Sequence, residues 1–212
     1  MTQPDVNRRL PIARRAFMTG AAASALTLTA ATAWAATETG YAEGDIAIGS
    51  EDAPVTVIEY ASMTCPHCAS FHNNTLKDLV EKYVDTGQVR MIFREFPFDQ
   101  LGLAAAMLAR CAGPDRAAGM IDVLFRQQSS WSRAGDPIAE LRKIGRLGGI
   151  SNSRFDACLS DQKLAESIVA TRREGEKKYD VSSTPSFIIN GDKYSGAMSL
   201  AEFDEVLKKY LN

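Results

Sequence analysis

Two cysteines three residues apart form the pattern with the clearest chemical use in this sequence. Cys65-Pro66-His67-Cys68 directly follows an apolar, β-branched stretch and begins a stretch with helical spacing, whose first turn accepts Pro66. Unpaired backbone amides and the positive end of the helix dipole favour thiolate over thiol at such a position, so we expect Cys65 to have a low pKa. The imidazole of His67, in the same turn, is expected to lower that pKa further.

A stable thiolate makes a disulfide between Cys65 and Cys68 easy to break, so we expect this pair to oxidise other thiols. Cys65 is predicted to be the nucleophilic sulfur that links to a substrate. Cys68 falls inside the predicted helix, where burial raises the pKa of a thiol, and it is predicted to resolve the mixed disulfide. The expected direction of electron flow depends mainly on His67.

A metal site is the alternative use of these cysteines. Cys68 and His72 are four residues apart on one face of the predicted helix, so Cys65, Cys68 and His72 could together bind zinc or copper. A structural zinc site normally has four protein ligands, and the sequence has only two histidines and no second pair of this spacing. We therefore expect no metal, and we expect His72 to be a solvated helix residue.

Glu59 lies in the middle of the apolar stretch that precedes the cysteines. A buried carboxylate is costly and tends to be functional when it is unpaired. We predict that Glu59 exchanges a proton with Cys68 through water. The alternative is that Glu59 points outward or pairs with a lysine.

Thr184-Pro185 precedes a later β-branched stretch. The bond before a proline adopts the cis form far more readily than other peptide bonds, and together with the cysteine pair this placement predicts a cis proline opposite the active sulfurs. A cis bond would expose the Thr184 backbone, which could then pair with an extended substrate chain.

The residues around the cysteine pair predict a strand, a helix and a second strand. Strands are expected over Val55–Tyr60 and Val89–Phe96, and a helix over Pro66–Val84 that stops at Gly87. This order implies that the two strands are parallel. An edge strand is expected around Asp45–Ile48.

The rest of the chain predicts a block of helices and then a hairpin. The expected helices are Leu101–Cys111, Pro114–Ser130, Pro137–Leu147, Ser151–Leu159 and Asp161–Tyr179. Asp136 is the expected N-cap of the helix that starts at Pro137. Two short strands, Pro185–Ile189 and Tyr194–Gly196, are expected around Asn190-Gly191-Asp192, followed by a final helix through Leu211 that Ser199 and Glu202 cap.

Residues 1–35 have the pattern of an export signal. Four arginines up to Arg15 precede the uncharged stretch Ala16–Ala33, and Ala33-Trp34-Ala35 offers small residues for cleavage near Ala35. Arg14-Arg15 is similar to a twin-arginine signal, while a general secretory signal and an uncleaved membrane anchor are the alternatives. All three place the domain outside the cytoplasm.

Charge and cysteine content exclude other classes of protein. Without residues 1–35 the chain has 20 Lys and Arg and 25 Asp and Glu, a net charge of −5, which argues against nucleic acid as a partner. Four cysteines permit disulfides in an exported chain but are too few for a disulfide-rich scaffold.

Taken together, the motif Cys65-Pro66-His67-Cys68, the preceding Glu59, the helical block and the later Thr184-Pro185 resemble the bacterial DsbA-type thiol:disulfide oxidoreductases. The resemblance implies an α/β thioredoxin fold with an inserted all-helical domain. Residues 36–98 would be the first half of the thioredoxin domain, 99–180 the insertion and 181–212 the second half. It also assigns Cys65 as the nucleophile, Cys68 as the resolving cysteine, His67 as the tuning residue, Glu59 as the buried acid and Thr184-Pro185 as the cis-proline loop.

The same resemblance implies a periplasmic enzyme that introduces disulfides into reduced exported proteins without a cofactor. We expect it to act as a monomer. The family's reoxidant is a quinone-linked membrane protein of DsbB type. An isomerase would need a dimerisation domain, for which residues 36–54 are too few. A reductase and a metal-binding protein stay open as alternatives.

Cys111 and Cys158 resemble the second cysteine pair of one branch of this family. If they are bonded, they close a loop of about 48 residues, which the loop-entropy model values at roughly 4 kcal/mol. Their expected role is structural.

Overall fold

The computed structural model describes residues 44–211, all of which belong to the second of two units, 1–33 and 34–212. The predicted export signal and its cleavage site near Ala35 lie outside the described residues. No helix among residues 44–211 combines the length and the apolar character needed to cross a membrane.

Within residues 44–211, five strands form a mixed sheet in the order β1-β3-β2-β4-β5. The parallel pair predicted from the sequence is confirmed, because β2 and β3 run in the same direction from Val55↔Val89 to Ala61↔Glu95. All other neighbours are antiparallel, and the short first strand lies at the edge as expected. The strands are β1 Ile46–Ile48, β2 Val55–Ala61, β3 Val89–Glu95, β4 Ser186–Ile189 and β5 Asp192–Ser195.

The connection between β2 and β3 is helical, but it is not the single helix predicted from the sequence. It consists of α1 Pro66–Asn74, α2 Leu76–Leu79 and a π-helical turn, Val80–Val84. The break falls at Thr75, which follows Asn73 and Asn74, and all three residues have low helix propensity. Gly87, with a φ of 74°, ends the connection where a stop was expected.

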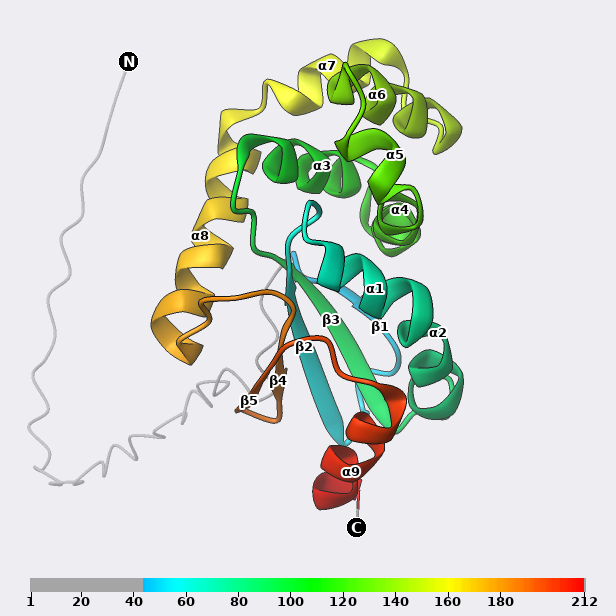
Figure 1. Cartoon of the computed structure of the whole chain (residues 1–212), viewed down its shortest axis with the longest axis vertical. Coiled ribbons are helices and arrows are strands. Elements are labelled where there is room, and N and C mark those ends of the chain that lie inside the picture. Colours follow the sequence, from blue (N-terminus) through cyan, green and yellow to red (C-terminus); the bar gives the residue numbers. More distant parts are fainter. Residues whose placement is uncertain (1–43, 212) are drawn as a thin grey trace, which may run out of the picture. The chain divides into compact units, whose positions relative to one another are not determined.

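Between β3 and β4 the chain forms six helices, α3 to α8, which are labelled in Figure 1. The predicted helix over Pro114–Ser130 is in fact two helices, because the backbone leaves helical geometry at Gln127. Asp136 caps α6 as predicted, with its carboxylate accepting a hydrogen bond from the Ala139 backbone N–H. The six helices are α3 Gln100–Cys111, α4 Pro114–Arg126, α5 Gln128–Ser132, α6 Pro137–Leu147, α7 Asn152–Leu159 and α8 Gln162–Tyr179.

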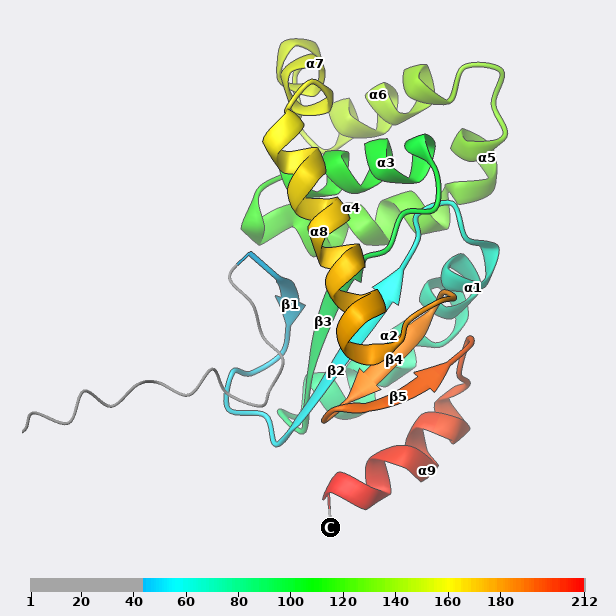
Figure 2. The ribbon, with the colours of Figure 1, turned by 90° about the vertical axis from the view of Figure 1, so that its left-hand side faces the viewer.

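The helices cover both faces of the sheet. The first five helices of the block, α3 to α7, gather at the end of the sheet where α1 begins, and α8 returns across one face (Figures 1 and 2). Gly175 permits that return, because a Cβ at this position would lie 2.6 Å from Cε1 of Tyr60. The opposite face packs on α1 and α9 (Leu200–Leu211), where Phe71, Phe187 and Phe203 meet.

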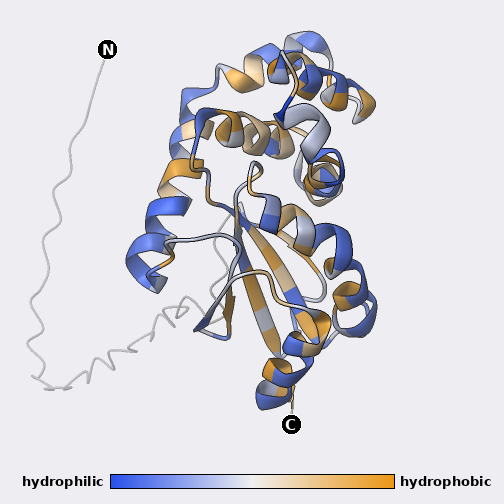
Figure 3. Cartoon of the chain, viewed as in Figure 1, coloured by the Kyte–Doolittle hydropathy of each residue, from blue (hydrophilic) through white to orange (hydrophobic). Residues whose placement is uncertain are grey.

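Both faces of the central strands are therefore buried. Every residue of β2 is buried, and the strand is largely apolar in Figure 3. Alternate residues enter two separate apolar clusters, Val55 and Val57 on the side of α1, and Ile58 and Tyr60 on the side of α8. A continuous apolar run is the pattern expected of such a strand.

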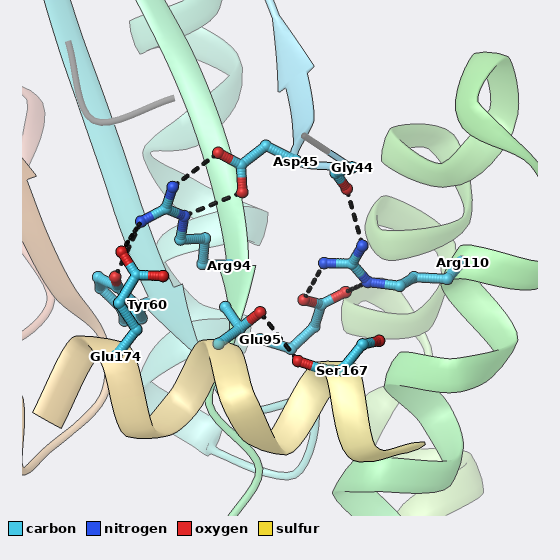
Figure 4. Close-up of polar contacts among 9 residues, drawn as sticks. Gly44, Asp45, Tyr60, Arg94, Glu95, Arg110, Ser167 and Glu174 are labelled. Atoms are coloured by element: carbon cyan, nitrogen blue, oxygen red, sulfur yellow. Dashed lines mark hydrogen bonds and ion pairs between the residues drawn. The ribbon is translucent and has the colours of Figure 1, made fainter. Parts of the chain in front are cut away.

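Two of the charged residues of β3 are buried, Arg94 and Glu95. Arg94 is buried on the face that α8 covers, where it donates two hydrogen bonds to Asp45, 2.9 and 2.8 Å long, and one of 3.1 Å to the Tyr60 hydroxyl (Figure 4). The Glu174 carboxylate of α8 lies 3.6 Å from the same guanidinium. Arg94 thereby connects the residue before β1 to the centre of the sheet and to α8.

Glu95 is buried on the other face and binds Arg110 of α3 through two hydrogen bonds of 2.6 Å. Arg110 also donates to the Gly44 carbonyl over 2.7 Å (Figure 4). These contacts attach the first helix of the helical block to the sheet.

The chain ends in a hairpin and a helix. Asn190 and Gly191, with φ of 45° and 99°, form a two-residue turn, so β5 starts at Asp192 instead of the predicted Tyr194. Ser199 and Glu202 cap α9 reciprocally, as predicted.

Candidate active site

Cys65 and Cys68 lie where β2 passes into α1. Cys65 is the N-cap of α1, Pro66 occupies the first turn, and Cys68 is inside the helix. The Cys65 sulfur is half-buried, whereas Cys68 is fully buried, and both cysteines are free thiols. The structure therefore describes the dithiol form of the pair, with one of the two sulfurs accessible.

The two sulfurs differ in acidity. The pKa of Cys65 is lowered to about 5, first by a hydrogen bond from the Cys68 thiol and then by Thr184 and by the backbone N–H groups of Cys68 and His67, against the opposing effect of burial. The pKa of Cys68 is raised, first by burial and then by the hydrogen bond with Cys65 and the charge of Glu59. Cys65 is therefore the thiolate of the pair, and Cys68 retains its proton.

His67 is exposed, and it lowers the pKa of Cys65 through its backbone N–H. This contribution comes from the start of the helix, as predicted for the amides there. The effect of the His67 imidazole stays a prediction.

The loop before β4 faces the reactive sulfur. The Thr184–Pro185 bond is cis, as predicted, and the Cys65 sulfur lies 3.3 Å from the Thr184 carbonyl oxygen, to which the protonated form of Cys65 donates a hydrogen bond. Two segments 119 residues apart in the sequence thus meet at this sulfur. Thr184 itself is buried, and its carbonyl is directed at the Cys65 sulfur.

Glu59 and His72 form a buried pair beside the cysteines. His72 Nε2 lies 2.9 Å from Glu59 Oε2, and both side chains are almost completely inaccessible. The prediction that His72 is a solvated helix residue is wrong, because α1 turns this position toward the sheet. Glu59 is buried as predicted, but its partner is a histidine instead of the lysine considered as an alternative.

Residues 44–211 contain no group of three or more His, Cys, Asp or Glu side chains placed to hold a metal ion. The candidate third ligand, His72, directs Nε2 at Glu59 instead.

Gln128 is a site residue that the sequence did not reveal. It is the first residue of α5, it is buried, and its amide donates to the carbonyls of Met63 and Cys65 over 2.8 and 2.9 Å. The helical block thereby contacts the loop that carries the nucleophile. No local pattern distinguishes it from Gln127, which is exposed.

A second contact holds the same loop from the other side. The Thr64 hydroxyl donates a hydrogen bond of 2.7 Å to Asp99, which is also the N-cap of α3 through the Gly102 backbone N–H. An aspartate directly before a helix is a recognisable N-cap signal, but its bond to Thr64 depends on the tertiary structure.

Cys111 and Cys158 are joined by a disulfide that connects α3 to α7. Their Cα atoms are 6.2 Å apart, within the usual range for this bond. The bond belongs to the helical block and takes neither Cys65 nor Cys68 as a partner.

Comparison with known proteins agrees with this geometry. The family profile described as Thioredoxin matches residues 41–209. A Rickettsia bellii protein whose name describes a protein-disulfide oxidoreductase is 34% identical over 174 residues, which cover 80% of this chain and 67% of that protein. For the similar Rickettsia typhi protein the covered share is 64%, so the chain spans about two thirds of the length of these relatives.

Solved structures match over most of their own length. The crystal structure of Wolbachia pipientis alpha-DsbA1 superposes with a TM-score of 0.75 at 32% identity, covering 81% of this chain and 92% of that one. Oxidised BdbD from Bacillus subtilis has the same fold, with a TM-score of 0.68 at 21% identity and coverage of 79% and 93%.

Proposed function

Because this chain belongs to the DsbA-type thiol:disulfide oxidoreductases of the thioredoxin family, we propose that it introduces disulfide bonds into reduced exported proteins in the periplasm. The observation that carries this proposal is the unequal pair at the start of α1. Cys65 is half-buried and its pKa is about 5, while Cys68 is fully buried and its pKa is raised. A dithiol form in which Cys65 is a stable thiolate favours reduction of the disulfide, and hence oxidation of the substrate.

The proposed reaction starts from the disulfide between Cys65 and Cys68. A substrate thiolate attacks the Cys65 sulfur, the bond to Cys68 breaks, and Cys68 leaves and takes up a proton. A second thiolate of the substrate then attacks the substrate's own sulfur in the mixed disulfide, and Cys65 leaves as a thiolate. Two substrate thiols are oxidised to one disulfide, and the enzyme pair accepts both electrons.

The loop of Thr184 and Pro185 is the proposed substrate-binding element. Its carbonyl lies 3.3 Å from the sulfur that forms the mixed disulfide, so an extended substrate chain bonded to Cys65 would run beside this backbone. We assign Cys111 and Cys158 a structural role, and we propose that a monomer acts with a quinone-linked membrane protein of DsbB type as its reoxidant.

The decisive experiment is the reduction potential of the Cys65–Cys68 pair, measured by equilibration with glutathione buffers. We expect a potential well above the value of about −270 mV typical of thioredoxin, toward the value of about −120 mV typical of DsbA. A value near thioredoxin's would overturn the proposal in favour of a reductase.

An activity assay tests the same proposal through the residues. The oxidised protein should form disulfides in a reduced, unfolded ribonuclease, and Cys65→Ser should abolish this activity. The matched control, Cys111→Ala with Cys158→Ala, removes two cysteines outside the site and should retain it. Full activity of Cys65→Ser would exclude the assigned nucleophile.

A further inference from the structure

Glu59 and His72 form a buried pair, and the proposed exchange reaction assigns no role to His72. Glu59 faces α1 from the centre of β2, and His72 follows Cys68 by four residues, on the same side of α1. The hydrogen bond between Nε2 and Oε2 is 2.9 Å long, and both residues are at most 5% exposed. Separate charges are expensive at such a site, so the two groups are expected to gain and lose protons as one unit.

Each residue of the pair has one buried polar atom that makes no hydrogen bond with the described residues. Glu59 Oε1 and His72 Nδ1 have no hydrogen-bond partner within the part of the chain that the structure describes. Buried polar atoms without partners are rare in native proteins and call for a specific explanation. A cavity of about 10 Å³ lined by both residues, close to the smallest volume that holds a water molecule, adjoins the pair.

Aromatic rings hold the His72 imidazole in this orientation. The ring of Phe125 from α4 lies 4.1 Å from it between centroids, and those of Phe71 and Phe93 lie 5.6 Å away. A ring packed on several sides keeps Nε2 on Glu59 without needing a bond at Nδ1. The packed rings therefore keep the His72 imidazole beside the Glu59 carboxylate, where it can accept or release a proton.

The same histidine also lines a groove at the surface. The groove has a volume of about 580 Å³ and lies between α1, α2, the π-helical turn, β1, β3 and α4. The charged residues that face this groove are Lys77, Glu81, Asp85 and Asp122. Arg94 and Glu95 line the small cavity and are engaged in ion pairs with Asp45 and Arg110.

We propose that His72 is a positioning residue that shares one proton with Glu59, so that the buried Cys68 sulfur receives and returns its proton through this pair. When a thiolate attacks Cys65, the bond to Cys68 breaks and Cys68 leaves as a thiolate. The protonated, uncharged pair passes one proton to Cys68, which becomes a thiol, and the pair becomes singly negative. The pair stays singly negative as long as Cys65 and Cys68 are reduced.

The reverse direction uses the same groups. When Cys68 must attack a mixed disulfide at Cys65, the singly negative pair accepts the Cys68 proton and becomes uncharged. Glu59 acts on Cys68 in the structure, since its charge is one cause that raises the pKa of this thiol. The inference rests on the proposed function only in requiring that the Cys65–Cys68 disulfide opens and closes.

Two rates distinguish a proton-sharing role of His72 from a structural role: the opening of the Cys65–Cys68 disulfide and the alkylation of Cys65. His72→Gln can still donate a hydrogen bond to Glu59 but cannot carry a proton between neutral and acid pH. We expect it to slow the opening of the Cys65–Cys68 disulfide by a small thiol about a hundredfold and to flatten the pH profile of that rate. Alkylation of Cys65, measured in a Cys68→Ala background with and without His72→Gln, should keep its pH midpoint. Asn74→Gln, an exposed change on the same helix, is the control and should leave both rates unchanged.

Nitrogen NMR of the His72 imidazole in the unmutated protein supplies a readout that needs no variant to fold. We expect its protonation at one fixed pH to change when a chemical reductant opens the Cys65–Cys68 disulfide. An unchanged His72 spectrum, or a His72→Gln variant with the unmutated rate and pH profile, would overturn the inference. Both measurements use small reagents, so a failure to oxidise protein substrates would count against the proposed function alone.

Discussion

Cys65 and Cys68 show how position within one helical turn separates two identical side chains. Cys65 is at the half-exposed N-cap, where a hydrogen bond from the Cys68 thiol, and then Thr184 and backbone N–H groups, lower its pKa to about 5. Cys68 is enclosed by the sheet and by the helical block, and its pKa rises because burial disfavours its charge. Hydrogen bonding to Cys65 and burial of Cys68 together therefore decide which of the two residues reacts with a substrate.

Gln128 is expected to keep the loop of the nucleophile in place. Gln128→Leu removes the donor for two carbonyls, of which that of Met63 is deeply buried, so the free energy of unfolding should fall by about 1–3 kcal/mol. The rate of disulfide exchange should fall with it. Denaturant unfolding and a thiol-exchange assay check this prediction.

The neighbouring residue is the control for that prediction. Gln127 is exposed at the junction of α4 and α5, so Gln127→Leu should change the free energy of unfolding by less than about 0.5 kcal/mol. Equal effects of the two substitutions would contradict the role assigned to the Gln128 amide.

At the scale of elements, the helical block is attached to the thioredoxin half by a shared apolar core and by specific polar contacts. Arg110 of α3 binds Glu95 of β3, and Gln128 of α5 reaches the loop before α1. Within the block, the disulfide between Cys111 and Cys158 connects two short helices. The nucleophile therefore lies at the start of α1, whereas the disulfide connects α3 and α7.

Removal of that disulfide should lower stability without changing the active pair. We expect Cys111→Ala with Cys158→Ala to reduce the free energy of unfolding by roughly 4 kcal/mol, because the bond closes a loop of 47 residues' separation. The pH midpoint of Cys65 alkylation should stay at about 5. A shifted midpoint would show instead that the second pair tunes the first.

At the scale of the whole molecule, the acidity of Cys65 links the redox state to stability. In the folded dithiol form the pKa of Cys65 is about 5, against an ordinary value of 9.0, so between these pH values the unfolded chain binds one more proton at this sulfur than the folded chain. Stability rises with pH wherever the unfolded state binds more protons. The stabilisation from Cys65 therefore grows from pH 5 toward pH 9 and is lost as pH falls through 5.

We accordingly expect the dithiol form to gain stability relative to the disulfide form as pH is raised between about 5 and 9. Denaturant unfolding of both forms across this range measures the difference, and the disulfide form, in which neither sulfur titrates, is the reference. A difference that stays constant, or that shrinks with rising pH, would contradict the thiolate assignment.

Local patterns account for what the sequence determined by itself. The parallel strands, the hairpin, the capped helices and the Cys65-Pro66-His67-Cys68 site follow from side-chain periodicity, turn residues and cap residues, which act over a few positions. The predicted helices that proved too long failed where weak local preferences decide, at Thr75 and at Gln127.

Only the tertiary structure decided which distant groups meet and which are shielded from water. It placed His72 on Glu59, Gln128 on the Cys65 carbonyl, Arg110 on Glu95 and Thr184 beside the reactive sulfur. These partners lie between 13 and 119 residues apart, and neither helical nor strand periodicity carries information over such separations. The acidity of each sulfur and the proton content of each buried group depend on those partners, because desolvation and hydrogen bonding act through space.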